Sequence, residues 1–150
     1  MNESPLSPRL LAAAELCAQA RSVIDVGCDH AQLCIHLARR YPELRLCASD
    51  LRPGPLASAR KNLAAAGFAE RVRTVLCDGL SAFSAQDGEA IVICGMGGEL
   101  ICKILAEAPW SLDGRLLVLQ PMSKAEVLRA FLAERGCAVM HERLVAEEEK

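Results

Sequence analysis

The chain has 150 residues, enough for one domain with a sizeable core, and 52% of them are hydrophobic but only 3% aromatic, so aliphatic side chains must build that core. The formal net charge of −2 is not typical of a protein that binds nucleic acid through overall positive charge. No apolar run approaches the roughly 18–20 residues that span a bilayer, and the N-terminus lacks the order of a signal peptide, so the sequence predicts a cytoplasmic protein without a membrane segment.

Helical and strand-like patterns alternate along the whole chain. Apolar residues three and four apart indicate helices, and short, nearly continuous apolar runs indicate buried strands. In chain order, the sequence predicts a helix at 4–20, a strand at 23–26, a helix at 32–40, a strand at 44–49, a helix at 55–66, a strand at 72–77, a short helical turn at 80–83, a strand at 90–94, a helix at 98–107, a strand at 116–120, a helix at 124–135 and a strand at 138–145. This order predicts an α/β fold, in which a mostly parallel sheet carries helices on both faces.

The end of the sequence follows the sixth predicted strand almost directly. Sheets of this type often finish in an antiparallel hairpin, and the second strand of that hairpin would lie beyond Lys150. We therefore expect residues 1–150 to form one domain of a longer protein, with the last antiparallel strand missing.

The first predicted strand ends in Asp25-Val26-Gly27-Cys28-Asp29-His30, where a dinucleotide-binding fingerprint would lie. Of the three fingerprint glycines only Gly27 is present, with Asp29 and Gln32 in the other two positions. A pyrophosphate binds helix N–H groups and is repelled by nearby carboxylates. S-adenosylmethionine carries a sulfonium and an ammonium group instead, so the pattern favours this cofactor over a nicotinamide dinucleotide.

Two further predicted strands end in a carboxylate. Asp50, about 20 residues after the glycine turn, can accept hydrogen bonds from both ribose hydroxyls of an adenosine. Asp78 can accept from an adenine amino group, and Gly79 lets the ring lie against the backbone, although Asp78 could instead cap the segment that follows. The series Asp25, Asp50 and Asp78 is more specific than any one of its members.

The fourth predicted strand runs into Gly95-Met96-Gly97-Gly98. Three glycines in four positions indicate that the backbone comes close to something, because glycine has no Cβ. In an open α/β sheet, ligands bind at the carboxyl ends of the strands. With the cofactor at the first strand, this turn is left for the substrate.

Eight cysteines are present, but no two form a Cys-x-x-Cys pair. We interpret them as small apolar residues and predict neither a metal site nor a disulfide framework. The three histidines form no recognisable nucleophile set with serine, cysteine or aspartate, so no catalytic residue is assigned.

Three motifs together resemble the bacterial tRNA (adenine-22-N1)-methyltransferases, a family of class I methyltransferases with a Rossmann-like fold. They are Asp25-Val26-Gly27-Cys28-Asp29-His30-Ala31, Ile93-Cys94-Gly95-Met96-Gly97-Gly98-Glu99-Leu100 and Leu119-Gln120-Pro121-Met122. The segments Leu6-Ser7-Pro8-Arg9-Leu10 and Gly54-Pro55 match as well, so the resemblance covers nearly the whole chain.

The resemblance implies methyl transfer from S-adenosylmethionine, without a metal, to N1 of an adenine in tRNA. The methionine end of the cofactor would contact Asp25, Gly27, Asp29 and His30; the ribose would contact Asp50 with Leu51 beside it, and the adenine would contact Asp78 and Gly79. The target base would lie at Gly95, Met96, Gly97 and Gly98, with Gly95 also near the cofactor and Arg9 at the mouth of the site.

The sequence departs from the family pattern in two places. Gln32 and Cys34 replace the usual Tyr and Pro, and the C-terminal helical domain that the family uses for tRNA binding is absent. A methyltransferase for ribosomal RNA or a small molecule would keep the same acidic series. A non-catalytic module that binds S-adenosylmethionine would keep it too, so both alternatives stay open.

Overall fold

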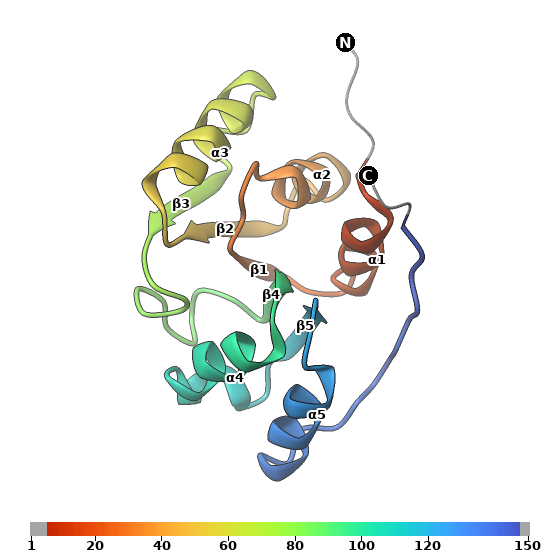
Figure 1. Ribbon diagram of the computed structural model, residues 1–150. Helices are drawn as coiled ribbons and strands as arrows, with labels where there is room; N and C mark the ends of the chain where they lie inside the picture. The colour runs from red at the N-terminus through yellow and green to blue at the C-terminus, as the bar shows by residue number, and fades with distance from the viewer. Residues whose placement is uncertain (1–5, 148–150) are drawn as a thin grey trace.

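The computed structural model describes residues 6–147 and shows a five-stranded parallel sheet between two layers of helices (Figure 1). The strands are β1 (Ser22–Val26), β2 (Arg45–Asp50), β3 (Val72–Leu76), β4 (Ala90–Met96) and β5 (Leu116–Pro121). The helices are α1 (Pro8–Leu16), α2 (Gln32–Arg40), α3 (Pro53–Ala65), α4 (Gly98–Ala106), the 3-10 helix η1 (Pro109–Leu112) and α5 (Ala125–Glu134).

The order of the strands across the sheet is β3-β2-β1-β4-β5, and every neighbouring pair is parallel. The chain moves outward from β1 to β2 and β3, then returns to the other side of β1 with β4. This reversal makes the carboxyl ends of β1 and β4 a topological switch point, which is where ligands bind in open α/β sheets.

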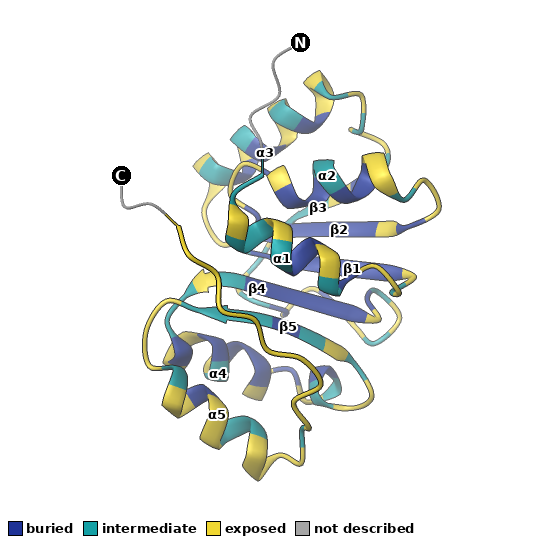
Figure 2. Ribbon diagram, turned by 90° about the vertical axis from the view of Figure 1, so that its right-hand side faces the viewer, coloured by how far each residue is buried: buried dark blue, intermediate teal, exposed yellow. Residues whose placement is uncertain are grey.

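Each face of the sheet buries its own hydrophobic cluster. Helices α1, α2 and α3 cover one face, and α4, η1 and α5 cover the other (Figures 1 and 2). Along β1, Val23 belongs to the first cluster and Ile24 to the second, and both are fully buried. Burial of such side chains contributes about 1.5–3 kcal/mol each, so a central strand apolar on both faces can lie only between two helical layers.

The predicted elements are confirmed for five strands and for the helices between them, within a few residues at their ends. The first helix is shorter than predicted, from Pro8 to Leu16 rather than 4–20, and residues 4 and 5 lie outside the described part of the chain. Residues 80–83 form hydrogen-bonded turns, with the Phe83 N–H donating to the Leu80 carbonyl, and not a helix. The 3-10 helix was not predicted.

The predicted sixth strand at 138–145 is wrong. Residues 137–147 have no regular secondary structure and cross the molecule as an extended, exposed segment (Figure 2). A strand needs a neighbour for its backbone N–H and C=O groups, and beyond Cys137, whose N–H donates to the Leu132 carbonyl, the described contacts of this segment are made by its side chains. Ion pairs Arg129–Glu142 and Arg143–Glu15 tie the segment to α5 and α1.

Candidate functional site

A cavity of about 530 Å³ opens at the carboxyl ends of the strands. Its walls come from the ends of β1, β2 and β4, from the segment after β3, from the starts of α1 and α2 and from α4. Most of the predicted site residues line it; these are Arg9, Asp25, Gly27, Asp29, His30, Asp50, Leu51, Asp78, Gly79, Gly95 and Met96. Gly97 and Gly98 are not among the lining residues.

The turn after β1 is fixed to the end of β2 by backbone hydrogen bonds. The N–H groups of Gly27 and Cys28 both donate to the Ser49 carbonyl, at 2.9 and 2.8 Å. The turn also contains three residues with positive φ: Gly27 at 73°, Asp29 at 48° and Ala31 at 60°. Two of these are not glycine, and such strain persists where the surrounding structure holds it and is concentrated at functional sites.

Gly27 has a φ of 73°, which favours glycine, and its missing Cβ also leaves room for a side chain that lies 69 residues further along the chain. A Cβ at Gly27 would sit 2.5 Å from Cε of Met96, well inside van der Waals contact. The predicted cofactor turn and the predicted substrate turn are therefore neighbours, with the methyl group of Met96 packed against Gly27 at the end of the adjacent strand β1.

Asp25 is a buried carboxyl group, 5% exposed, at the cavity floor. Burial raises its pKa to about 7, and the charge of Asp50 adds to this, while a hydrogen bond from the Cys34 thiol at 3.9 Å acts in the opposite direction. A cation bound in the cavity would favour the carboxylate form, because an opposite charge offsets its desolvation.

Asp50 is equally buried and is oriented by two backbone donors. Its Oδ2 accepts from the Asp29 N–H at 3.3 Å, and its Oδ1 accepts from the Arg52 N–H at 3.1 Å. Each carboxylate oxygen can accept a further hydrogen bond, so the group remains able to bind hydroxyls of a ligand.

Asp78 follows β3 and is exposed. The alternative that it caps a helix finds no support, since residues 80–83 form turns and no helix begins there. Gly79 has a φ of 56°, and a Cβ there would lie 3.1 Å from carbons of Ile104 on α4. Close packing against α4 therefore explains this glycine, in addition to the predicted contact with the adenine ring.

His30 lies at the rim of the cavity and is oriented toward α3. Its Nδ1 is 2.9 Å from Oγ of Ser58, and its carbonyl accepts from the Asn62 side chain at 3.0 Å. Its Nε2 lies 3.8 Å from Oδ2 of Asp29. These contacts fix the turn after β1 to α3 as well as to β2.

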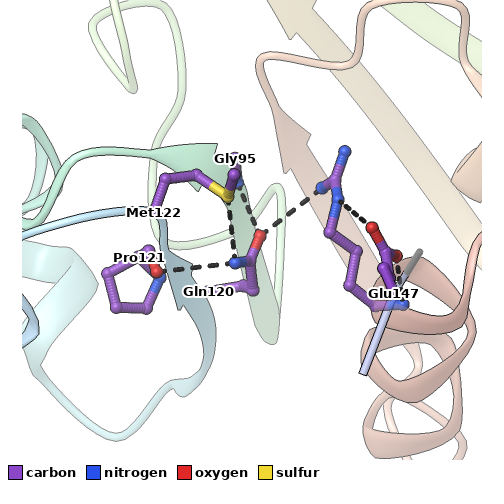
Figure 3. A network of polar contacts seen from close by, with 6 residues as sticks. Gly95, Gln120, Pro121, Met122 and Glu147 are labelled. Carbon is purple, nitrogen blue, oxygen red and sulfur yellow. Dashed lines mark hydrogen bonds and ion pairs between the residues drawn. The ribbon is translucent and has the colours of Figure 1, made fainter. Parts of the chain in front are cut away.

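Gly95 and Arg9 lie close together on the side of the cavity opposite His30. They are joined by Gln120, which the sequence analysis did not assign to the site. Oε1 of Gln120 accepts from the Gly95 N–H at 3.0 Å and from Nη1 of Arg9 at 3.4 Å (Figure 3). Glu147 accepts from the Arg9 N–H at 2.9 Å. The only sequence signal for Gln120 was its place in the Gln-Pro-Met motif, and Glu147 gave none.

Gly97 and Gly98 contact the connection between β5 and α5. A Cβ at Gly98 would lie 2.2 Å from the Lys124 carbonyl oxygen, and the Gly98 N–H donates to the Ser123 carbonyl at 2.7 Å. A Cβ at Gly97 would lie 3.1 Å from Oγ of Ser123. Close packing of two backbones thus accounts for Gly98, whereas a role in substrate binding for either glycine stays a prediction.

Residues 6–147 offer neither a metal site nor a membrane span. No group of three or more histidine, cysteine or acidic side chains in this range has an arrangement that could hold a metal ion. None of the helices in the same range is long and apolar enough to cross a membrane. The eight cysteines are free thiols, and burial raises the pKa of Cys17, Cys28 and Cys94 to about 12, which keeps these three protonated at neutral pH.

Comparison with known proteins agrees with this geometry. A curated relative, tRNA (adenine(22)-N(1))-methyltransferase of Bacillus subtilis, is 32% identical over the whole chain, which spans 63% of the length of that protein. Its crystal structure matches 97% of this chain and 63% of that one, with 31% identity and a TM-score of 0.88. A Streptococcus pneumoniae relative in complex with S-adenosyl-L-methionine is 38% identical, with a TM-score of 0.81 over 88% of this chain and 63% of that one.

The family model described as "Methyltransferase domain" matches residues 6–150. The strand order, the cavity at the switch point and the relatives together confirm the predicted Rossmann-like fold of class I methyltransferases. This chain belongs to the methyltransferase-domain family.

Proposed function

We propose that this chain is the catalytic part of an enzyme that transfers a methyl group from S-adenosylmethionine to N1 of the adenine at position 22 of tRNA. The observation that carries the proposal is the arrangement of Asp25, Asp50 and Asp78 at three neighbouring strand ends around one cavity, opposite Gly95 and Met96. The B. subtilis relative has this activity in its name and matches the chain throughout.

The cavity suits the cofactor for a chemical reason. Asp25 and Asp50 are both 5% exposed, and buried carboxylates gain from a cationic ligand that replaces the water they have lost. Asp25 would face the ammonium and sulfonium end with Gly27, Asp29 and His30. Asp50 and Leu51 would hold the ribose, and Asp78 and Gly79 the adenine. When bound, S-adenosylmethionine supplies an electrophilic methyl group.

The chain needs no strong base for this reaction, because N1 of neutral adenine already carries an in-plane lone pair. Its contribution is to hold that nitrogen in line with the methyl group, which lowers the barrier by fixing geometry. The Gly95 and Met96 backbone lines the cavity where a base edge can enter. The target base must be unpaired or flipped out, at a cost of a few kcal/mol.

Arg9 is a cation at the cavity that can contact the RNA, although its Nε lies 3.8 Å from Oε2 of Glu147. It lines the cavity, and its side chain is 32% exposed. An arginine at the mouth can bind a phosphate next to the target base, and guanidinium–phosphate pairs have both charge and geometry in their favour. A tRNA substrate also implies a cytoplasmic location.

The test is a map of modified nucleosides. Transcribed tRNA is incubated with the chain and isotope-labelled S-adenosylmethionine, digested and analysed by mass spectrometry. The matched control is the same tRNA with guanosine in place of the target adenosine. We expect 1-methyladenosine at the target position and none in the control. Methylation of ribosomal RNA or of a small molecule in its place would overturn the substrate, and cofactor binding without any transfer would overturn the enzymatic role.

A further inference from the structure

The ladder between β4 and β5 is interrupted at the edge of the cavity. Cys94 pairs with Gln120 and Met96 with Pro121, so Gly95 is an extra residue on β4, with a φ of 77°. Such a bulge leaves the backbone of the extra residue without its ladder partner. The Gly95 N–H is instead bonded by the side chain of Gln120, at 3.0 Å from Oε1.

The same oxygen atom also holds Arg9. Nη1 of Arg9 donates to Oε1 of Gln120 at 3.4 Å, over a sequence separation of 111 residues (Figure 3). The guanidinium lies beside the bulge, because a Cβ added to Gly95 would be 3.5 Å from Nη1. One carboxamide oxygen therefore joins the two cavity residues to which a substrate role is proposed.

The other end of the carboxamide fixes its orientation. Nε2 of Gln120 is 3.2 Å from Sδ of Met122 and donates to the Pro121 carbonyl at 3.5 Å. A flipped amide would turn NH2 toward the Gly95 N–H, placing two donors against each other. Glutamine thus supplies the acceptor that Gly95 and Arg9 need and the donor that faces the β5–α5 connection.

We infer that Gln120 is a positioning residue that holds the Arg9 guanidinium and the Gly95 backbone in the orientation needed to contact the RNA substrate. This inference rests on the proposed function. Gln120 itself is not among the residues that line the cavity. Its role is therefore carried by Arg9 and Gly95, and its loss should weaken the use of tRNA without weakening the binding of S-adenosylmethionine.

The experiment compares Gln120→Met, which keeps the size but loses the hydrogen bonds, with Gln120→Glu, which keeps the acceptor. Gln86→Met, in an exposed turn, is the matched control. We expect Gln120→Met to lower kcat/KM for tRNA about tenfold, as for a lost hydrogen bond to a charged group, with the calorimetric Kd for S-adenosylmethionine within about twofold of wild type. Gln120→Glu should lose less, and Gln86→Met nothing.

A double-mutant cycle with Arg9→Met tests the coupling directly. If Gln120 acts through Arg9, the double variant loses clearly less than the product of the two single losses. Fully multiplicative losses, an equal loss in Gln120→Glu and Gln120→Met, or a parallel loss of cofactor affinity would each overturn the inference. A wild-type chain that forms no 1-methyladenosine would contradict the proposed function instead, so the two failures are distinguishable.

Discussion

The two sides of the cavity are built in different ways. On the side of β1 and β2, Asp25 and Asp50 are 5% exposed, and the turns around them are joined by backbone hydrogen bonds. On the side of β4 and β5, Gly95 is exposed, and its bulge is held by the side chain of Gln120. Buried carboxylates can bind polar groups of a small cofactor, and an exposed strand bulge is accessible to a macromolecule, so this contrast matches the proposed division of the cavity.

Loss of the Asp50 carboxylate should have the largest effect. We expect Asp50→Ala to weaken binding of S-adenosylmethionine about a hundredfold, because two hydrogen bonds to a charged group are worth about 3 kcal/mol together. Asp50→Asn keeps an acceptor for a backbone N–H and should lose less. Calorimetry measures both, with exposed Asp113→Ala as the control. Unchanged affinity in Asp50→Ala would show that the ribose lies elsewhere.

A substitution that adds a Cβ at Gly27 should disturb both the β1 side and the β4 side of the cavity. Gly27→Ala forces an alanine into a left-handed conformation, at a cost of about 1–2 kcal/mol, within the turn that lines the cavity, and it also displaces the end of the Met96 side chain, so kcat/KM should fall about tenfold. Gly67→Ala is the matched control, since Gly67 also has a positive φ, 84°, but nothing lies within 4 Å of its added Cβ. It should lose stability without losing activity. Unchanged activity in Gly27→Ala, or equal activity losses in the two variants, would contradict a specific role of the Gly27 turn in the site.

The raised pKa of Asp25 predicts that cofactor affinity depends on pH. With a pKa of about 7, the group is mostly neutral at pH 6 and charged at pH 8, so binding of a cationic ligand should tighten up to about tenfold across this range. Asp25→Asn should flatten the profile, and its calorimetric titration at several pH values is the measurement. A wild-type profile that is flat between pH 6 and 8 would contradict the cationic contact.

The raised pKa of Asp25 also determines whether the free energy of unfolding rises or falls with pH. An unfolded aspartate titrates near pH 4, well below the native pKa of about 7, so the folded protein binds more protons between these values. The contribution of Asp25 to the free energy of unfolding is therefore lost as the pH rises from about 4 to about 7. Thermal melts of the ligand-free protein should show that Asp25→Asn removes this part of the pH dependence.

The smallest effect on activity is expected for a change on the side of β4 and β5. Met122→Ala removes an exposed apolar side chain beside Met96, whose carbonyl accepts from the Met122 N–H at 2.9 Å. We expect the KM for tRNA to rise about threefold, as for a partly buried contact, with cofactor affinity unchanged. Met140→Ala is the control, because Met140 is 74% exposed in the C-terminal segment. A larger loss in Met140→Ala than in Met122→Ala would move the RNA surface away from the cavity.

Local patterns predicted most of the fold and the side of the cavity formed by β1 and β2. The apolar runs that became β1 and β4 are buried on both faces, and nearly continuous runs of this kind fit only a covered parallel sheet. Parallel strands bring their carboxyl ends to one edge, so Asp25 and Asp50 could be assigned to one site from their positions alone. The sixth strand failed because an apolar run specifies a strand only where a neighbouring strand offers its backbone.

The order of elements and the acidic end of the site could therefore be read from the residues, since both follow from short-range periodicity and from sheet geometry. The packing of Met96 against Gly27 and the link that Gln120 makes between Gly95 and Arg9 became visible only in the folded chain. These contacts link residues 25 to 111 positions apart, through side chains whose directions no local pattern specifies.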